Sequence, residues 1–279
     1  MNAMQAFPAS FLLLFHQVAL GGLFAIAATP FHELSRGFYK STAGVLFVVG
    51  ALGFLGKADL YRKSLPADQS QGSFIELLFY LPFILSFALY LYSLWGERVV
   101  FRARVFSISL FAGLIALAAS SRGFFQAPLG SIETLLYPAS FFFSALLLGG
   151  VTVGMLIGHW YLIDTGQSID PFIRIFKFFF IALALQTVFF LLLPVLLYYF
   201  GSPNTVHNLH ELWEGHRILL ISRLLTTQGG SLVLSFMIWR TLKIPHTMAA
   251  TGLFYIALLG VFVGEILGRQ ILALTSLPF

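Results

Sequence analysis

The chain has 279 residues, of which 58% are hydrophobic and 10% charged, a formal net charge of +5 and no cysteine. A soluble protein of this length needs far more charged residues to cover its surface, so the composition excludes an ordinary soluble domain. The lack of cysteine excludes disulfides, thiol chemistry and iron–sulfur ligation by this chain itself.

Apolar stretches recur along the whole chain, and each has about the 20 residues that a helix needs to cross a bilayer. They are rich in Leu and Phe and do not alternate, which favours helices over the strands of a membrane barrel. We therefore predict an all-α integral membrane protein, a bundle of eight transmembrane helices that forms a single polytopic domain over residues 1–279. The predicted spans are residues 9–29, 42–57, 74–95, 104–121, 136–160, 171–200, 217–240 and 248–272.

The distribution of basic residues predicts the orientation of these spans. An even number of spans places both chain ends on one side, and basic residues accumulate in the cytoplasmic loops of membrane proteins. The loops after the odd-numbered spans hold nine basic residues and the opposite face holds five, so we expect both termini on the outer, periplasmic side. The nine are Arg36, Lys40, Arg98, Arg102, Arg104, Arg174, Lys177, Arg240 and Lys243, and the five are Lys57, Arg62, Lys63, Arg122 and Arg217.

Two longer outer loops are expected, at residues 56–73 and 201–216. The second collects histidines and acids, and the spacing of His207, His210 and Glu211 would suit a zinc ion. A solvated polar loop is the more common meaning of such a segment.

Ionisable residues within the spans are costly in a bilayer, so each needs a partner or a function. The last span contains Gly-Glu-Ile-Leu-Gly-Arg, in which Glu265 and Arg269 are four residues apart on one helix face. Gly264 and Gly268 flatten an adjacent strip, so that another helix can approach. Arg223 lies roughly 9 Å into span seven at 1.5 Å per residue, and Glu265 lies at a similar depth from the outer end of span eight. If these antiparallel spans are neighbours, the two side chains lie beside each other.

His16 and Gln17 in span one and Gln228 in span seven are expected at a similar depth. The predicted buried layer therefore contains His16, Gln17, Arg223, Gln228, Glu265 and Arg269. It can be read as a set of ion pairs that only fixes the packing of the helices, because buried ion pairs often have a purely structural role. It can also be read as a proton-handling pocket for a quinone, in which His16 and Glu265 act as bases or relays and the arginines donate to the headgroup.

Three further histidines, His32, His159 and His246, are expected at the inner ends of the helices. Ordinary polar helix ends are the usual explanation, and His159 is the best functional candidate among them. A haem of the b type would need two facing intramembrane histidines, but only His16 is clearly intramembrane.

The overall layout resembles the membrane-anchor, quinone-interacting subunits of the dimethyl-sulfoxide-reductase, polysulfide-reductase and NrfD-like family. The similarity rests on eight spans with both ends outside, the opening helix Leu14–Leu23, the segment Arg223–Leu234 with Thr-Gln-Gly-Gly-Ser, and Gly-Glu-Ile-Leu-Gly-Arg at Gly264–Arg269. The segment Thr-Pro-Phe-His-Glu-Leu-Ser-Arg after span one matches the family's histidine-containing loop only loosely.

The resemblance implies a bacterial or archaeal inner-membrane subunit of a respiratory oxidoreductase complex. Such a subunit binds a quinone, menaquinone or ubiquinone, holds no haem or iron–sulfur cluster, and exchanges electrons with an iron–sulfur partner on the outer face. A further subunit, typically a molybdopterin enzyme, carries the catalysis, so the chain would be an enzyme only within its complex. The alternatives are a secondary transporter or proton-conducting protein that uses the buried Arg, Glu and His residues, and a purely structural membrane anchor.

Overall fold

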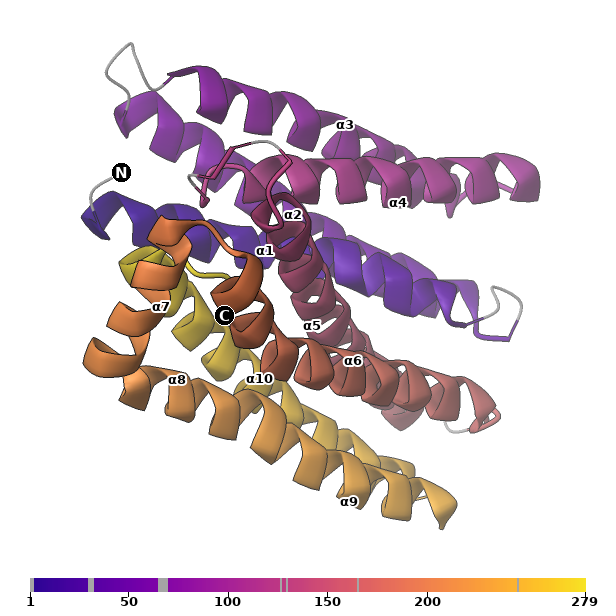
Figure 1. The fold of residues 1–279 in the computed structure, drawn as a ribbon. Coiled ribbons are helices and arrows are strands. Elements are labelled where there is room, and N and C mark those ends of the chain that lie inside the picture. Colours follow the sequence, from indigo (N-terminus) through magenta and orange to yellow (C-terminus); the bar gives the residue numbers. More distant parts are fainter. Residues whose placement is uncertain are drawn as a thin grey trace.

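A computed structural model describes residues 3–29, 33–64, 70–125, 127–128, 130–164, 166–244 and 246–279 (Figure 1). Most of these residues are helical and none forms a strand, and eight of the helical segments are long and apolar enough to cross a membrane, which confirms the predicted all-α class. The elements are α1 (Ala3–Ala27), α2 (Arg36–Ser64), α3 (Ser70–Ser93), α4 (Val99–Ser121), α5 (Glu133–Ile163), α6 (Asp170–Phe200), α7 (Pro203–Gly215), α8 (Arg217–Arg223), η2 (Leu224–Gly230), α9 (Ser231–Lys243) and α10 (Thr247–Thr275).

Helices α1 and α5 form the centre of the bundle. Of their spanning windows 78% and 72% are buried inside the protein, whereas the other six spans are 28% to 39% buried. Helix α1 packs against α2, α4, α5 and α10, and α5 also packs against α6 and α10. The outer helices therefore face lipid with apolar side chains, as their uniform Leu and Phe content requires.

The two central helices touch through glycine. A Cβ atom on Gly21 would lie 1.7 Å from the carbonyl oxygen of Ala145, and one on Gly149 would lie 1.8 Å from the carbonyl carbon of Gly21. Only residues without a side chain permit this backbone approach, which is a common device for packing helices in membranes. The crossing brings the polar residues of α1 and α5 into the interior.

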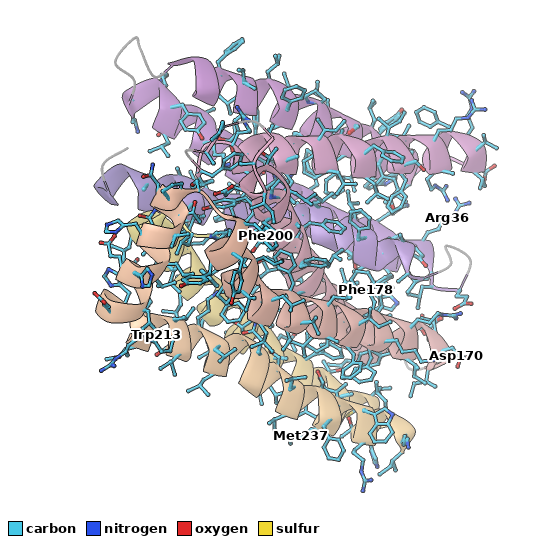
Figure 2. All side chains as sticks on the ribbon, in the orientation of Figure 1. Arg36, Asp170, Phe178, Phe200, Trp213 and Met237 are labelled. Carbon is cyan, nitrogen blue, oxygen red and sulfur yellow. The ribbon has the colours of Figure 1, made fainter. Side chains whose placement is uncertain are left out.

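Polar and charged side chains gather at the two ends of the bundle (Figure 2). Trp213 lies at the end where α1 begins and α10 finishes, which we call the first end, and Arg36 and Asp170 lie at the opposite, second end. Apolar side chains such as Phe178 and Met237 occupy the region between them.

Both predicted outer loops are largely helical, contrary to expectation. Helix α2 continues to Ser64 and α3 begins at Ser70, so most of residues 56–73 extends the two spans. Residues 203–215 form α7, a short helix whose N-cap is Ser202, the side chain of which accepts from the backbone N–H of Thr205. Pro203 occupies the first turn, where its missing N–H costs nothing. The polar composition of both segments concealed these helices.

The seventh span is one unbroken helical segment, but it is not α-helical throughout, because the π-helical turn η2 joins α8 to α9. A π-helical turn is wider than an α-helical one and often marks a functional site. Here the two successive residues Thr227 and Gln228 are both buried. The span predicted at 217–240 is present, as Arg217–Lys243, and the π-helical turn within it was not predicted.

Candidate functional site

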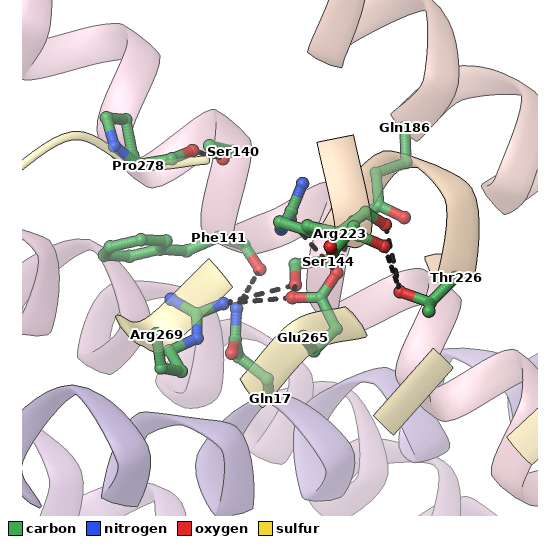
Figure 3. A network of polar contacts seen from close by, with 11 residues as sticks. Gln17, Ser140, Phe141, Ser144, Gln186, Arg223, Thr226, Glu265, Arg269 and Pro278 are labelled. Carbon is green, nitrogen blue, oxygen red and sulfur yellow. Dashed lines mark hydrogen bonds and ion pairs between the residues drawn. The ribbon is translucent and has the colours of Figure 1, made fainter. Parts of the chain in front are cut away.

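A buried ion cluster lies between α5, α6, α8 and α10, with Glu265 at its centre (Figure 3). Nη2 of Arg223 lies 3.3 Å from Oε1 of this carboxylate, and Nη2 of Arg269 lies 3.2 Å from Oε2. All three side chains are at most 3% exposed. The structure thus brings together the three charged residues that the sequence placed in one layer.

Two uncharged residues complete the coordination of Glu265. The Oγ of Ser144 on α5 donates to Oε2, and Nε2 of Gln186 on α6 donates to Oε1 over 2.7 Å. Neither residue was among the predicted members of the buried layer. Gln186 offered a signal, since it is the one amide in an otherwise Phe- and Leu-rich helix. Ser144 offered none, because serine is common in membrane helices.

The glycines of α10 make room for the cluster, as the sequence suggested. A Cβ atom on Gly264 would lie 1.7 Å from Oγ1 of Thr227, and one on Gly268 would lie 2.4 Å from Nε of Arg223. Helix α8 and η2 can therefore lie directly on α10, and Arg223 can reach Glu265 across the groove that the glycines leave.

The cluster contains two arginines and one carboxylate, so it carries a net charge of +1 within an apolar bundle. The faces of two aromatic rings lie near the guanidinium groups, Phe190 at 4.9 Å from Arg223 and Phe141 at 5.0 Å from Arg269. Ring faces stabilise a desolvated cation but do not use its N–H groups as hydrogen bonds would. Nε and Nη1 of Arg223 and Nε of Arg269 are buried and find no hydrogen-bond partner among the residues that the structure describes.

A strip of buried polar residues continues from Arg223 along η2 and α9. Its members are Thr227, Gln228, Ser231 and Ser235, each at most 2% exposed. The side-chain oxygens of all four and the amide nitrogen of Gln228 make no hydrogen bond within the described structure. Buried polar groups are nearly always paired, so a row of unpaired ones calls for a ligand or ordered water.

His16 does not belong to this cluster, although it is fully buried at 0% exposure. Its ring stacks on Tyr80 and Phe83 of α3, with centroid separations of 4.4 and 5.0 Å, and its Nε2 lies 3.2 Å from the carbonyl oxygen of Gly113 on α4. A carbonyl oxygen only accepts, so Nε2 carries the proton of the neutral ring. Nδ1 is then a buried acceptor, and no group in the described part of the chain donates to it.

Gln17 faces α5 rather than α3 and α4, and it lies next to the cluster. Its Nε2 donates over 2.8 Å to the carbonyl oxygen of Phe141, whose ring covers Arg269. Its Oε1 is buried without a partner. The two adjacent residues of the predicted layer thus serve different sides of the bundle.

A second buried ion pair joins α2 to α3 on the side of His16. Lys57 pairs with Glu76, which also accepts from the hydroxyl of Tyr61. Lys57 is 0% exposed, although the sequence placed it in the outer loop. That assignment was wrong because α2 extends two turns further than its apolar run. Tyr80 follows Glu76 by one turn and stacks on His16, so this pair and His16 form one polar region.

The other histidines contribute little. His159 is exposed, with its Nδ1 3.4 Å from the hydroxyl of Tyr255, and His246 is an exposed residue at the start of α10. His32 lies outside the described residues. His207 and Glu211 lie on α7, and within the described ranges no three His, Asp or Glu side chains are placed to hold a metal ion. His16 is the one buried histidine in the described part of the chain.

No protein-family model, curated protein or solved structure matches this chain. The chemical groups of this region are the fully coordinated carboxylate of Glu265 and the N–H donors of Arg223 and Gln228. The imidazole of His16, which faces α3 and α4, adds an acceptor nitrogen without a described partner.

Proposed function

We propose that the chain is a quinone-binding membrane subunit of a respiratory oxidoreductase complex. The observation that carries this proposal is the set of polar groups on Arg223 and Gln228 that are buried and have no hydrogen-bond partner among the described residues. These two side chains supply N–H donors in an apolar setting, which is what the two carbonyl oxygens of a quinone headgroup require.

The residues present fit a quinone, which when bound supplies redox chemistry that takes up or releases protons together with electrons. Nε and Nη1 of Arg223 and the amide of Gln228 would hold the carbonyl oxygens. The buried donors are already desolvated, so pairing them with an acceptor recovers the free energy that their burial costs. Thr227 and Ser231 extend the polar lining along the same strip.

Proton transfer requires an acceptor with a free lone pair, and this criterion separates the two candidate bases. Both oxygens of Glu265 already accept from arginines and from Ser144 and Gln186. Nδ1 of His16 has no hydrogen-bond partner among the described residues, but the ring faces α3 and α4 rather than Arg223. We therefore assign His16 a proton-relay role on the side of Lys57 and Glu76, without contact to the quinone, and Glu265 a positioning role that orients Arg223 and Arg269.

The surroundings of the chain follow from the same proposal. Because the chain has no cysteine, an iron–sulfur partner subunit on the outer face would exchange electrons with the quinone, and a further redox subunit of molybdopterin type would carry the catalysis. We assign the first end of the bundle to the outer face of a bacterial or archaeal inner membrane, because basic residues are more numerous at the second end.

One observation favours a second candidate, a purely structural membrane anchor. The full coordination of Glu265 is what a packing element needs, and a buried pair can fix helix register without any chemistry. This reading accounts for Glu265 but leaves the unpaired groups of Arg223, Gln228 and His16 unexplained.

The experiment uses the full-length chain purified with its partner subunits. Turnover is measured once with a quinol and once with an artificial donor that bypasses the membrane subunit. His16→Ala and Gln228→Leu should each lower quinol-linked turnover, the first by removing the proton relay and the second by removing a donor to the quinone. Artificial-donor turnover and subunit assembly should stay unchanged, and the exposed His159→Ala is the matched control.

Full quinol-linked turnover in both variants would leave the structural anchor as the surviving candidate. Proton conduction by the purified protein in vesicles without any quinol would instead favour the transporter.

A further inference from the structure

A groove lies between α6 and α9 at the second end of the bundle, apart from the ion cluster. Its volume is about 440 Å³, within the range of roughly 300–1,000 Å³ that is usual for ligand sites. The walls are apolar, and they consist of Ile173, Phe176 and Phe180 from α6 and Leu232, Phe236 and Trp239 from α9. Such a groove suits a hydrocarbon chain.

The end of the groove is basic. Lys177 from α6 and Lys243 from α9 both line it, and no lining residue is acidic. Nζ of Lys243 lies 3.7 Å from the ring centroid of Trp239, which holds the ammonium group at the rim. Neither lysine forms an ion pair within the described structure, so both positive charges are available to a ligand.

The groove is long enough for an extended occupant. Leu232 and Lys243 are separated by about 16 Å along the helix, at 1.5 Å per residue. Ser235 lies between them and lines the groove, but it is only 1% exposed, so the walls are almost wholly apolar. The occupant must therefore have an apolar chain and an anionic head that meets two lysines.

We propose that this groove binds an anionic phospholipid, with the phosphate at Lys177 and Lys243 and an acyl chain along Phe176, Phe180 and Phe236. Lys243 is the last residue of α9, and Lys177 lies two turns from Asp170, which begins α6 at the second end, so both lysines lie near the ends of their helices, where headgroups are met. Basic pockets between membrane helices recognise lipid headgroups in this way. A quinone would fill the groove equally well but has no anionic head to meet the lysines. The lipid site is independent of the proposed function.

The test is a titration of the full-length protein with phosphatidylglycerol or phosphatidylcholine of identical acyl chains, followed by native mass spectrometry. The double variant K177Q/K243Q should weaken phosphatidylglycerol binding about 30-fold, from the usual contribution of two lysines near a membrane surface. Phosphatidylcholine binding should be unaffected. Leu232→Trp, which fills the groove, should weaken the binding of both lipids.

Lys40→Gln is the matched control, because Lys40 also lies over a tryptophan, Trp95, at 5.0 Å, and also follows the start of a helix at the second end. It should leave both affinities unchanged. Equal affinity of the K177Q/K243Q variant and the unaltered protein for phosphatidylglycerol would overturn the proposal. So would displacement of the bound lipid by a short-chain quinone, which would assign the groove to the quinone tail.

Discussion

Replacing Glu265 with glutamine should destabilise the protein more than removing either arginine that contacts it. The cluster has two positive charges and one negative charge, all at most 3% exposed. Glu265→Gln leaves two buried guanidinium groups without a counter-charge. Arg223→Met leaves Glu265 and Arg269, which face one another at 3.2 Å on α10 and form a neutral pair.

The expected magnitudes follow from this difference in charge. Breaking a buried ion pair by removing one partner costs about 3–5 kcal/mol, and this range applies to Glu265→Gln. Arg223→Met loses one charge-assisted hydrogen bond of 3.3 Å, which contributes about 1.5–3 kcal/mol. It also removes the unpaired Nε and Nη1 of Arg223, so the cost should fall at the lower end of that range.

The free energy of unfolding can be measured for both variants in the same detergent or bilayer by a reversible method such as steric trapping. Glu214→Gln, on the exposed face of α7, is the matched control and should change the free energy by less than about 0.5 kcal/mol. The reasoning fails if Glu265→Gln is as stable as the unaltered protein, or if Arg223→Met is the more damaging change.

Three further predictions use the same measurement. Gly268→Ala should displace Arg223, because its Cβ would lie 2.4 Å from Nε, whereas Gly252→Ala on the same helix meets nothing within 4 Å and should be neutral. Gly149→Ala should force α1 and α5 apart, because its Cβ would lie 1.8 Å from the backbone of Gly21; Gly44→Ala in α2, with open space around it, is its control. Lys57→Met should cost about 3–5 kcal/mol by leaving Glu76 unpaired, and the double variant Lys57→Met/Glu76→Leu should recover most of that loss. A Gly149→Ala protein with an unchanged free energy of unfolding would contradict the close packing of α1 on α5. A double variant no more stable than Lys57→Met would contradict the energetic role given to the Lys57–Glu76 pair.

Much of the fold could be predicted, because apolar length alone decides which segments cross a membrane. The helices of the structure cover most of each predicted span, although the spans predicted at 9–29 and 74–95 run two residues past the ends of α1 and α3. Several helices are longer than predicted, for example to Ser64 in α2 and back to Glu133 in α5, because polar residues at helix ends carry no apolar signal. Helix α7 was missed for the same reason, since its residues are mostly polar.

The candidate site was predictable where the chain itself sets the geometry. Glu265 and Arg269 are one turn apart on one helix, and the depth of Arg223 follows from its distance to the start of the span. The partners from other helices were not predictable, because the rotation of a helix about its axis depends on packing. The adjacent residues His16 and Gln17 illustrate this, since one faces α3 and α4 and the other faces α5.

Lys57 shows a different limit of sequence reasoning. A lysine at the end of an apolar run reads as a loop residue, and only the arrangement of α2 beside α3 brings Glu76 to it. Glu76 lies on α3, whereas Lys57 and Tyr61 lie on α2, so no spacing within one helix indicates the Lys57–Glu76 ion pair.

The central claim is that a quinone binds beside Arg223 and Gln228. Photoaffinity labelling of the full-length protein with an azido-quinone, followed by peptide mapping, tests it most directly. Labelling should be saturable, should be displaced by unlabelled quinone, should map to α8, η2 and the facing part of α10, and should be lost in Gln228→Leu. The absence of saturable labelling, or labelling confined to helices that do not contact η2, would contradict the claim.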